Sequence, residues 1–311
     1  IRIFQSEGAF NILKLTPGYE KNADAIVSQW QGHTFISGED GECDYAIVLN
    51  RVGKKSRNVT CPKDNIWQII QEPYAFHLHD WMLDAQEPYS RVYTHFVPNK
   101  ASKYIRSYPA LPWFVNKTYD ELESMKIPNK NKNLSWITSN KSLFPGHRDR
   151  MSFLDAIQDS KVDLDIFGSG IKFIEDKWDA LEQYKYSLAI ENARSNDYWT
   201  EKLADCYLSF SLPIYYGCPN ISEYFPPDSF ITIDIRNPQE AINIIQQAIE
   251  NNEWEKRLPA ILEARELVLK EYNPLSFLVQ RIDIDQKRVQ LSPSPIELKP
   301  YKRTNERRIK N

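Results

Sequence analysis

One segment decides the fold: the apolar run Tyr186-Ser-Leu-Ala-Ile190, the polar turn Glu191-Asn-Ala-Arg-Ser-Asn-Asp197, and a helical pattern that begins near Thr200. In an open α/β sheet, ligands bind beyond the carboxyl ends of the strands, and a helix N-terminus offers free N–H groups to phosphate. Lys202 adds a positive charge in the first helical turn, slightly against the helix dipole. Because a cation at this position slightly destabilises the helix, its presence indicates a functional role. We therefore predict that this turn faces a phosphate group.

Strands and helices alternate on both sides of this segment. The patterns predict strands at 133–138, 162–167, 212–216 and 229–233, and helices at 148–159, from 237 and from 253 to 273. Such alternation indicates a parallel, doubly wound sheet. Asn237 is expected to cap its helix, with Pro238 at the first position and Glu240 completing a capping box. The last helix is expected to turn Trp254, Leu258, Ile261, Leu262 and Val268 to one apolar face.

The first half of the chain also reads as an α/β unit. Its β-rich runs lie at 44–50, 65–71 and 91–97. The polar, proline-marked segment 127–133 is typical of a linker. For 311 residues two domains are the normal expectation. We therefore predict an acceptor-binding domain at 1–130, a donor-binding domain at 131–280, a cleft between the two, and a basic tail at 281–311.

Composition excludes several classes of function. The formal net charge of −3 argues against a general nucleic-acid binder. The four cysteines have no metal-ligand spacing and are expected to be reduced and buried. No run approaches the roughly 20 apolar residues of a membrane span, and the first residues do not resemble a cleaved leader. We expect a body in solution, with the cytoplasm preferred, a peripheral membrane location possible in a bacterium, and the Golgi lumen possible for a eukaryotic catalytic domain.

The familiar catalytic motifs of nucleoside triphosphatases, dinucleotide enzymes, zinc proteases and serine hydrolases are absent from the sequence. Asp163-Leu-Asp165 resembles the D-x-D of metal-dependent sugar transferases, but it lies in an alternating run that predicts a strand. His77, His79 and Asp80 lack a third ligand at a diagnostic spacing. We predict no metal site.

Several runs in order carry a resemblance to a known family. They are Ile190-Glu-Asn192, Asp197-Tyr-Trp-Thr-Glu-Lys-Leu203, Leu212-Pro-Ile-Tyr-Tyr-Gly217 and 219–230, with Arg150-Met-Ser-Phe153 and 162–168 upstream. Together they resemble the α-1,3-fucosyltransferase family, glycosyltransferase family 10. The resemblance implies a GT-B architecture of two Rossmann-like domains facing a central cleft, GDP-fucose as the donor substrate, inversion at the anomeric carbon, no required cofactor, and a glycan or glycoconjugate as acceptor.

The resemblance also implies a donor-binding set, consisting of Arg150, Asn192, Tyr198, Glu201 and Lys202. Arg150 and Lys202 would neutralise the diphosphate as charge grows on it. Glu201 would hold the ribose hydroxyls, Tyr198 would pack on the base, and Asn192 would contact the diphosphate or the sugar.

Inversion needs a base that takes the proton of the incoming hydroxyl. Glu72 is our candidate, because it follows the apolar run Trp67-Gln-Ile-Ile-Gln71 and stands where the family carries its glutamate. Asp80, His77 and His79 are reserve candidates for the same role.

Two alternatives stay open. Ile190 stands where the family usually has Phe, and Trp199 where it usually has a smaller residue, so another nucleotide sugar could be the donor. A sugar-nucleotide-binding or carbohydrate-binding module without turnover is the other alternative. The basic tail from Lys287 onward favours a solvated, partly disordered end, with contact to an anionic membrane as the sharper hypothesis.

Overall fold

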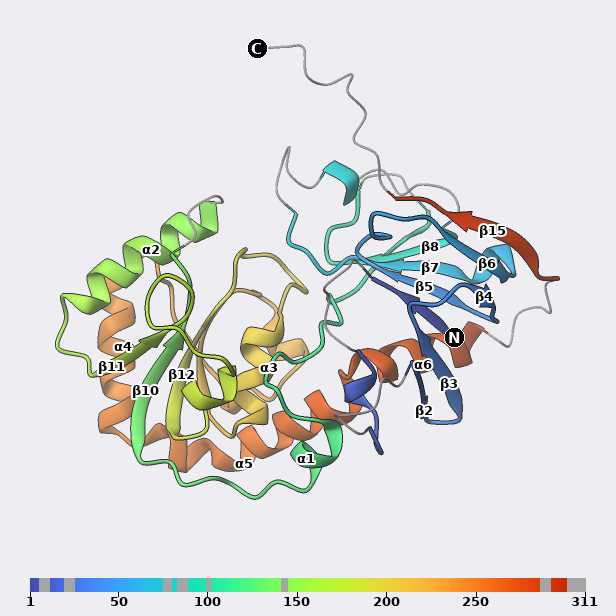
Figure 1. Ribbon diagram of the computed structural model, residues 1–311. Helices are drawn as coiled ribbons and strands as arrows, with labels where there is room; N and C mark the ends of the chain where they lie inside the picture. The colour runs from blue at the N-terminus through green and yellow to red at the C-terminus, as the bar shows by residue number, and fades with distance from the viewer. Residues whose placement is uncertain are drawn as a thin grey trace, which may run out of the picture. The chain divides into compact units, whose positions relative to one another are not determined.

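A computed structural model describes residues 1–5, 12–19, 26–74, 80–82, 89–98, 102–140, 145–285 and 292–300. The chain divides into two compact units, one of residues 1–109 with 278–311 and one of residues 110–277 (Figure 1). The predicted limits at 130 and 280, with an acceptor-binding domain, a donor-binding domain and a tail, stay a prediction.

The first unit is built on a seven-stranded sheet in the order β2-β3-β1-β5-β7-β8-β9, parallel except for the pair β2 and β3. Its strands are β1 (Arg2–Phe4), β2 (Val27–Trp30), β3 (His33–Ser37), β5 (Ala46–Leu49), β7 (Ile66–Ile69), β8 (Arg91–Thr94) and β9 (Tyr104–Arg106). Short 3-10 turns lie at η1 (Ile12–Leu15), η2 (Lys63–Asn65) and η3 (Asp80–Met82). The three strands predicted from the sequence in this half are therefore confirmed as β5, β7 and β8.

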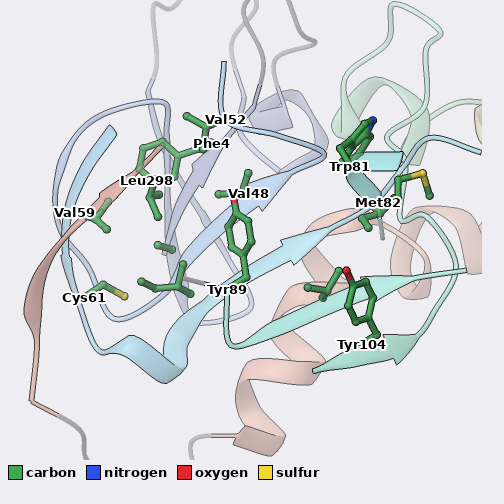
Figure 2. Close-up of a cluster of buried hydrophobic side chains, with 14 residues drawn as sticks. Phe4, Val48, Val52, Val59, Cys61, Trp81, Met82, Tyr89, Tyr104 and Leu298 are labelled. Carbon is green, nitrogen blue, oxygen red and sulfur yellow. The ribbon is translucent and has the colours of Figure 1, made fainter. Parts of the chain in front are cut away.

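A second, three-stranded sheet in this unit contains part of the predicted tail. Strand β15 (Ser294–Leu298) pairs antiparallel with β6 (Arg57–Cys61), which pairs in parallel with β4 (Gly41–Glu42). Figure 2 shows Leu298 within the buried cluster of the unit, near Val59 and Phe4. Full burial of a leucine contributes about 1.5–3 kcal/mol. Residues 294–298 are thus ordered, and a disordered end beginning at 287 was wrong for this stretch.

The second unit has a five-stranded, wholly parallel sheet in the order β11-β10-β12-β13-β14. Its strands are β10 (Lys132–Ile137), β11 (Leu164–Phe167), β12 (Tyr184–Ile190), β13 (Leu212–Tyr216) and β14 (Ile231–Thr232). All five strands were predicted, although β14 is shorter than expected. Because the order reverses direction at β10 and β12, the sheet has the topological switch point at which open α/β sheets bind ligands.

Helices cover this sheet on both faces. The second unit contains α1 (Tyr119–Glu123), α2 (Pro145–Gln158), α3 (Glu201–Leu208), α4 (Pro238–Glu250) and α5 (Glu253–Glu266), with short turns at η4 (Lys177–Ala180), η5 (Ile221–Glu223), η6 (Pro227–Ser229) and η7 (Leu267–Glu271). Most of α6 (Pro274–Asp285) belongs to the first unit, where Asp285 pairs with Arg91 of β8. Figure 1 shows α2 beside α4 on one side of the sheet and α3 on the other. Trp136 of β10 packs against Phe153 of α2, with ring centroids 5.9 Å apart. The α/β class predicted from the sequence is confirmed.

Two helix details differ from the prediction. Asn237 does not cap α4 through its side chain; its amide donates instead to the Glu240 carboxylate at 2.6 Å, so the capping box is wrong although Pro238 does open the helix. The long helix predicted from 253 to 273 is α5 followed by the π-helical turn η7, and Leu262, placed on its apolar face, is 37% exposed. The contact of Asn237 with Glu240 and the packing around the end of α5 determine these two features. The periodicity of apolar residues in the sequence predicts neither.

The polar segment 127–133 contains a buried cation. The Lys130 ammonium donates to the carbonyls of Leu181 (3.0 Å) and Ser209 (2.6 Å) and to the Ser211 hydroxyl (3.0 Å). Burial lowers the pKa of Lys130 to about 7. The residue types that suggested a linker therefore include one that ties the start of β10 to two loops of the second unit.

Lys130 gives a pH dependence of stability with a definite sign. Its pKa is lower in the folded chain than in the unfolded chain, so between about pH 7 and 10 folding releases a proton and stability rises with pH, by at most about 1.4 kcal/mol per pH unit. Urea unfolding from pH 6.5 to 9 should show this slope in the wild type and a smaller slope in Lys130→Met. Identical slopes in the two proteins would contradict a depressed pKa at this lysine.

Candidate functional site

The polar turn after β12 lies where the sequence predicted it. Parallel neighbours β10, β12 and β13 end at the same edge of the sheet, so Thr138, Glu191 and Gly217 follow their carboxyl ends together. Helix α3 starts directly after Thr200, which is its N-cap. The predicted strand, turn and helix are confirmed.

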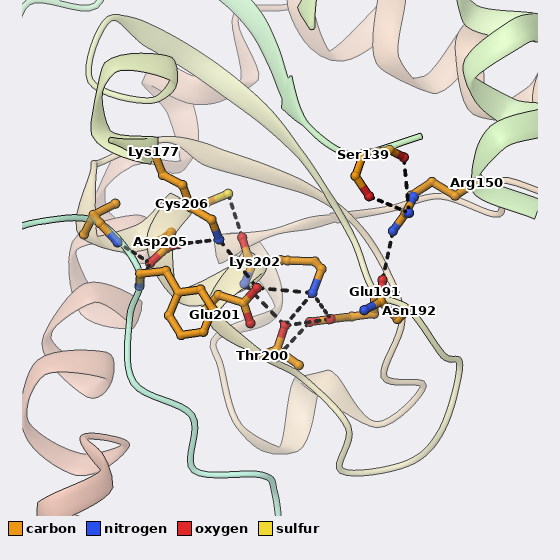
Figure 3. A network of polar contacts seen from close by, with 12 residues as sticks. Ser139, Arg150, Lys177, Glu191, Asn192, Thr200, Glu201, Lys202, Asp205 and Cys206 are labelled. Atoms are coloured by element: carbon orange, nitrogen blue, oxygen red, sulfur yellow. Dashed lines mark hydrogen bonds and ion pairs between the residues drawn. The ribbon is translucent and has the colours of Figure 1, made fainter. Parts of the chain in front are cut away.

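A buried carboxylate fixes the geometry of this turn. The two oxygens of Glu191 accept from the backbone N–H and the hydroxyl of Thr200, each at 2.7 Å (Figure 3). Gly217 leaves the room that this carboxylate needs, because a Cβ there would lie 2.4 Å from Cγ of Glu191. Two N–H groups that the sequence predicted to be free at this helix end have partners: the Glu191 carboxylate accepts from the N–H of Thr200, and the Thr200 hydroxyl accepts from the N–H of Lys202.

Lys202 uses all its donors within the turn. Its ammonium lies 3.2 Å from Thr200 Oγ1, 3.3 Å from Glu201 Oε1 and 3.4 Å from Glu191 Oε2. An ammonium has three N–H donors, so each has an acceptor here. The cation that seemed to oppose the helix dipole is thereby compensated by two carboxylates. Binding of a phosphate oxygen by Lys202 would require it to exchange one of these partners.

A second cation, Lys177, extends the cluster along α3. Its ammonium lies 3.5 Å from Glu201 Oε1 and 3.2 Å from Asp205 Oδ2. Burial alone would raise the pKa of Glu201, but the charges of Lys202 and Lys177 lower it to about 2. Burial raises the pKa of Asp205, against the opposing charge of Lys177. Glu201 is therefore a carboxylate at neutral pH and an acceptor for hydroxyl groups.

Asp205 also attaches a distant segment to α3. One of its oxygens accepts the backbone N–H of Phe114 at 2.8 Å. The Phe114 ring lies 4.9 Å from the Lys177 ammonium and is 41% exposed. An exposed aromatic ring thus lies one side chain away from Glu201. Sequence reasoning missed these contacts, because 91 positions separate Phe114 from Asp205.

Arg150 and Asn192, both assigned to the donor site by the family resemblance, are joined directly. Arg150 on α2 is buried and donates to the Asn192 side-chain oxygen at 2.8 Å, while its other terminal nitrogen lies 3.4 Å from Ser139 (Figure 3). Its Nε is buried without a hydrogen-bond partner among the described residues. Burial lowers the pKa of Arg150, although a guanidinium stays charged in proteins. Gly146 brings α2 against this turn, since a Cβ there would meet the Asn192 carbonyl at 2.3 Å.

Two aromatic residues of the motif lie in the interior of the unit. Tyr198 is 2% exposed, so it presents almost no surface to a base in this arrangement, and its role as a base contact stays a prediction. Trp199 is 4% exposed and packs edge-on against Phe225 and Tyr272, with centroids 5.0 and 5.4 Å away.

Glu72 belongs to the first unit and is exposed three residues after β7. Asn50 holds this turn, because its side-chain oxygen accepts the backbone N–H groups of Gln71 (2.7 Å) and Glu72 (3.3 Å). The position after a strand end is as predicted, and the catalytic role stays a prediction. Of the reserve candidates, His77 and His79 lie outside the described residues, and Asp80 opens η3.

Asp165 has the structural role that was favoured for the D-x-D run. Its carboxylate accepts from the Tyr184 hydroxyl at 2.5 Å and from the Lys132 ammonium at 3.1 Å, within the sheet. Across the described ranges, no group of three or more His, Cys, Asp or Glu side chains is arranged to hold a metal ion. In the same part of the chain, no helix combines the length and apolarity that a bilayer crossing requires.

The two largely parallel sheets and the helices between their strands give the protein an α/β fold of GT-B type, with two Rossmann-like units. OtsA in its apo form shares this fold, with a TM-score of 0.50 at 7% identity over 80% of this chain and 74% of that one. Residues 127–256 match the model of glycosyltransferase family 10 (fucosyltransferase), C-terminal part. This match lies within the second unit, and the resemblance to the α-1,3-fucosyltransferase family is confirmed.

Two curated relatives are similar to part of this chain. The alpha-(1,3)-fucosyltransferase FucT of Helicobacter pylori is 40% identical over 74 residues, which cover 24% of this chain and 16% of that protein. The 4-galactosyl-N-acetylglucosaminide 3-alpha-L-fucosyltransferase 9 of Bos taurus is 30% identical over 133 residues, which cover 41% of this chain and 36% of that protein. The matched stretches thus span well under half the length of these relatives.

Proposed function

We propose that this chain transfers fucose from GDP-fucose to a hydroxyl group of an acceptor glycan or glycoconjugate. The observation that carries the proposal is the Arg150 to Asn192 hydrogen bond beside the Glu191–Lys202 turn, inside the segment that matches family 10. A buried guanidinium bonded to Asn192 and a lysine in contact with the preceding Glu191 suit an anionic leaving group. Fucose is the sugar in the names of the relatives, and GDP-fucose is the donor that the family resemblance implies.

Departure of GDP leaves negative charge on the diphosphate. Arg150 presents a planar fork of donors that matches phosphate oxygens, whereas Lys202 is a compact, mobile cation. The unpartnered Nε of Arg150 is a donor available to such an anion after a small movement of the side chain. Lys202 would exchange its contact with Glu191 or Thr200 for a phosphate oxygen. Charge stabilisation by preorganised donors needs no metal.

Glu201 is our candidate for holding the ribose hydroxyls. It is ionised at neutral pH and only 8% exposed, and two ammonium groups fix its carboxylate. An ionised carboxylate accepts hydrogen bonds that are roughly twice as strong as neutral ones. This role keeps Glu201 in the donor-binding set and adds Lys177 as the residue that positions it.

The exposed ring of Phe114 is our candidate platform for the base, in place of the buried Tyr198. Base stacking on an aromatic ring is worth about 1–3 kcal/mol by alanine substitution. Phe114→Ala should therefore weaken GDP and guanosine by the same factor, about 5- to 150-fold, in titration calorimetry, and leave inorganic pyrophosphate unaffected. Phe114→Tyr keeps the ring and should bind all three like the wild type. If Phe114→Ala binds guanosine normally, the base lies elsewhere.

Inversion at the anomeric carbon, with Glu72 as the base, is the stereochemical part of the proposal. Direct attack by the acceptor hydroxyl opposite the leaving diphosphate needs one carboxylate on the acceptor side and no covalent intermediate. Proton NMR of the first product formed reports its anomeric configuration. A product with the configuration of the donor would exclude inversion.

Another nucleotide sugar is the alternative donor, suggested by Ile190 and Trp199. Trp199 fills an aromatic cluster in the interior, so packing accounts for it without a changed donor. A binding module without turnover is the other alternative.

A screen of GDP-, UDP- and dTDP-sugars by thermal shift and hydrolysis, with and without chelator, separates the proposed function from these two alternatives. Stabilisation and turnover with GDP-fucose alone, unaffected by chelator, supports the proposal; a preference for UDP-sugars overturns it.

Membrane contact through the basic tail is a further proposal, and with it a peripheral location. It concerns the residues after β15, because 294–298 belong to a sheet. Clustered basic residues near anionic headgroups contribute about 1 kcal/mol each. Co-sedimentation with phosphatidylserine liposomes should fall when residues 301–311 are removed, and equal partitioning would exclude this contact.

A further inference from the structure

We infer that Cys43 and Cys61 form a redox-active thiol pair, which closes to a disulfide when the chain meets a small-molecule disulfide such as oxidised glutathione. Both residues belong to the first unit, and neither takes part in the donor site. The inference is therefore independent of the proposed transferase activity.

Strand pairing brings the two cysteines together. In the parallel pair of β4 and β6, Glu42 lies opposite Thr60, so the next positions along the two strands are Cys43 and Cys61. The backbone N–H of Cys43 donates to the Thr60 carbonyl at 3.0 Å and holds this register. Neighbouring strands lie about 4.8 Å apart, which falls in the Cα separation of about 4.4–6.8 Å found in disulfides.

The two side chains lie next to each other on neighbouring strands. The Cys61 thiol donates to the backbone carbonyls of Asp44 at 3.6 Å and Asn65 at 3.9 Å. Interaction with the Cys61 side chain lowers the pKa of Cys43, and interaction with Cys43 together with burial raises the pKa of Cys61. Cys61 is fully buried in the cluster shown in Figure 2, whereas Cys43 packs against that cluster and is half-buried. Cys43 is thus the accessible, more acidic thiol, and Cys61 is the resolving thiol behind it.

The other two cysteines lack this arrangement. Cys206 donates to the Lys202 carbonyl at 3.1 Å, and Cys218 donates to the Asn220 side-chain oxygen at 3.0 Å. Both are buried, and burial raises the pKa of each to about 12. They are therefore an internal control for any oxidation of the native chain.

The oxidation proceeds by two exchange steps. The Cys43 thiolate attacks one sulfur of oxidised glutathione, whose S–S bond breaks and releases one glutathione thiolate. Cys61 then loses its proton to water and attacks the Cys43 sulfur of the mixed disulfide, releasing the second glutathione. The protein loses two protons and two electrons, and the oxidant gains both to become two thiols.

The native full-length chain, incubated with excess oxidised glutathione, acid-quenched and alkylated in denaturant, tests this inference by peptide mass spectrometry. We expect two of the four cysteines to escape alkylation and a peptide pair linked through Cys43 and Cys61. Cys43→Ser should prevent both the mixed disulfide and the link. Cys61→Ser should stop at a glutathione adduct on Cys43.

The double variant Cys206→Ser/Cys218→Ser is the matched control and should form the link as the wild type does. The inference is overturned if four thiols remain alkylatable, if the wild type stops at the glutathione adduct, or if the link appears only in the denatured chain. None of these outcomes bears on fucosyl transfer.

Discussion

Replacing Arg150 by alanine should lower kcat/KM for fucosyl transfer by about 100- to 1000-fold, the scale measured when one preorganised donor to a developing negative charge is removed. The guanidinium lies on α2, is buried, and is already oriented by Asn192 and Ser139. Its interaction should be strongest when the diphosphate carries its full charge, so kcat should fall more than KM rises. Initial rates at varied GDP-fucose measure both parameters.

Arg148 provides the matched control for this variant. It lies two positions earlier on the same helix and is exposed, so Arg148→Ala should change kcat/KM less than threefold, roughly, as surface substitutions usually do. Arg150→Lys keeps the charge but loses the planar fork, and an intermediate loss is expected. If Arg150→Ala folds normally and turns over like Arg148→Ala, Arg150 does not stabilise the leaving group.

Glu72→Gln should reduce turnover by about 100-fold or more, because it removes the group that accepts the proton of the attacking hydroxyl. The side chain is exposed after β7, and the turn is held through backbone contacts to Asn50. The substitution therefore leaves the local hydrogen bonds in place. GDP affinity, measured by titration calorimetry, should stay unchanged, since the loss concerns the chemical step alone.

Glu42→Gln is the companion control, as Glu42 is another exposed carboxylate of the first unit. It should retain wild-type turnover. Full activity in Glu72→Gln would eliminate this residue as the base and return attention to Asp80, His77 and His79. A parallel loss of GDP affinity would instead assign Glu72 to binding.

The strands of the second unit and the charged turn were predictable because their signals are local. The apolar run 186–190, the polar turn and Thr200 lie within fifteen consecutive positions, and each element is specified by its own residues. Arg150 and Asn192 were found through the ordered motif. Their hydrogen bond joins a helix and a turn 42 positions apart, which spacing alone does not reveal.

The partners of these residues were beyond sequence reasoning. Lys177, Asp205 and Phe114 meet only because three distant segments pack together. The alternation of polar and apolar residues also cannot show whether an aromatic ring near a site faces the ligand or the interior. The burial of Tyr198 was therefore not predictable from the sequence. In the same way, β15 depends on pairing with β6 across more than 230 positions.

We propose that the turn from Glu191 to Lys202 binds a nucleoside diphosphate. Titration of GDP and of guanosine into the wild type and Lys202→Met tests this binding, because the methionine keeps most of the apolar stem and removes the ammonium, with its charge and its three N–H donors. We predict that GDP affinity falls at least tenfold, about 1.4 kcal/mol, while guanosine affinity stays the same. Equal losses for GDP and guanosine, or no loss for GDP, would contradict a diphosphate site at this turn.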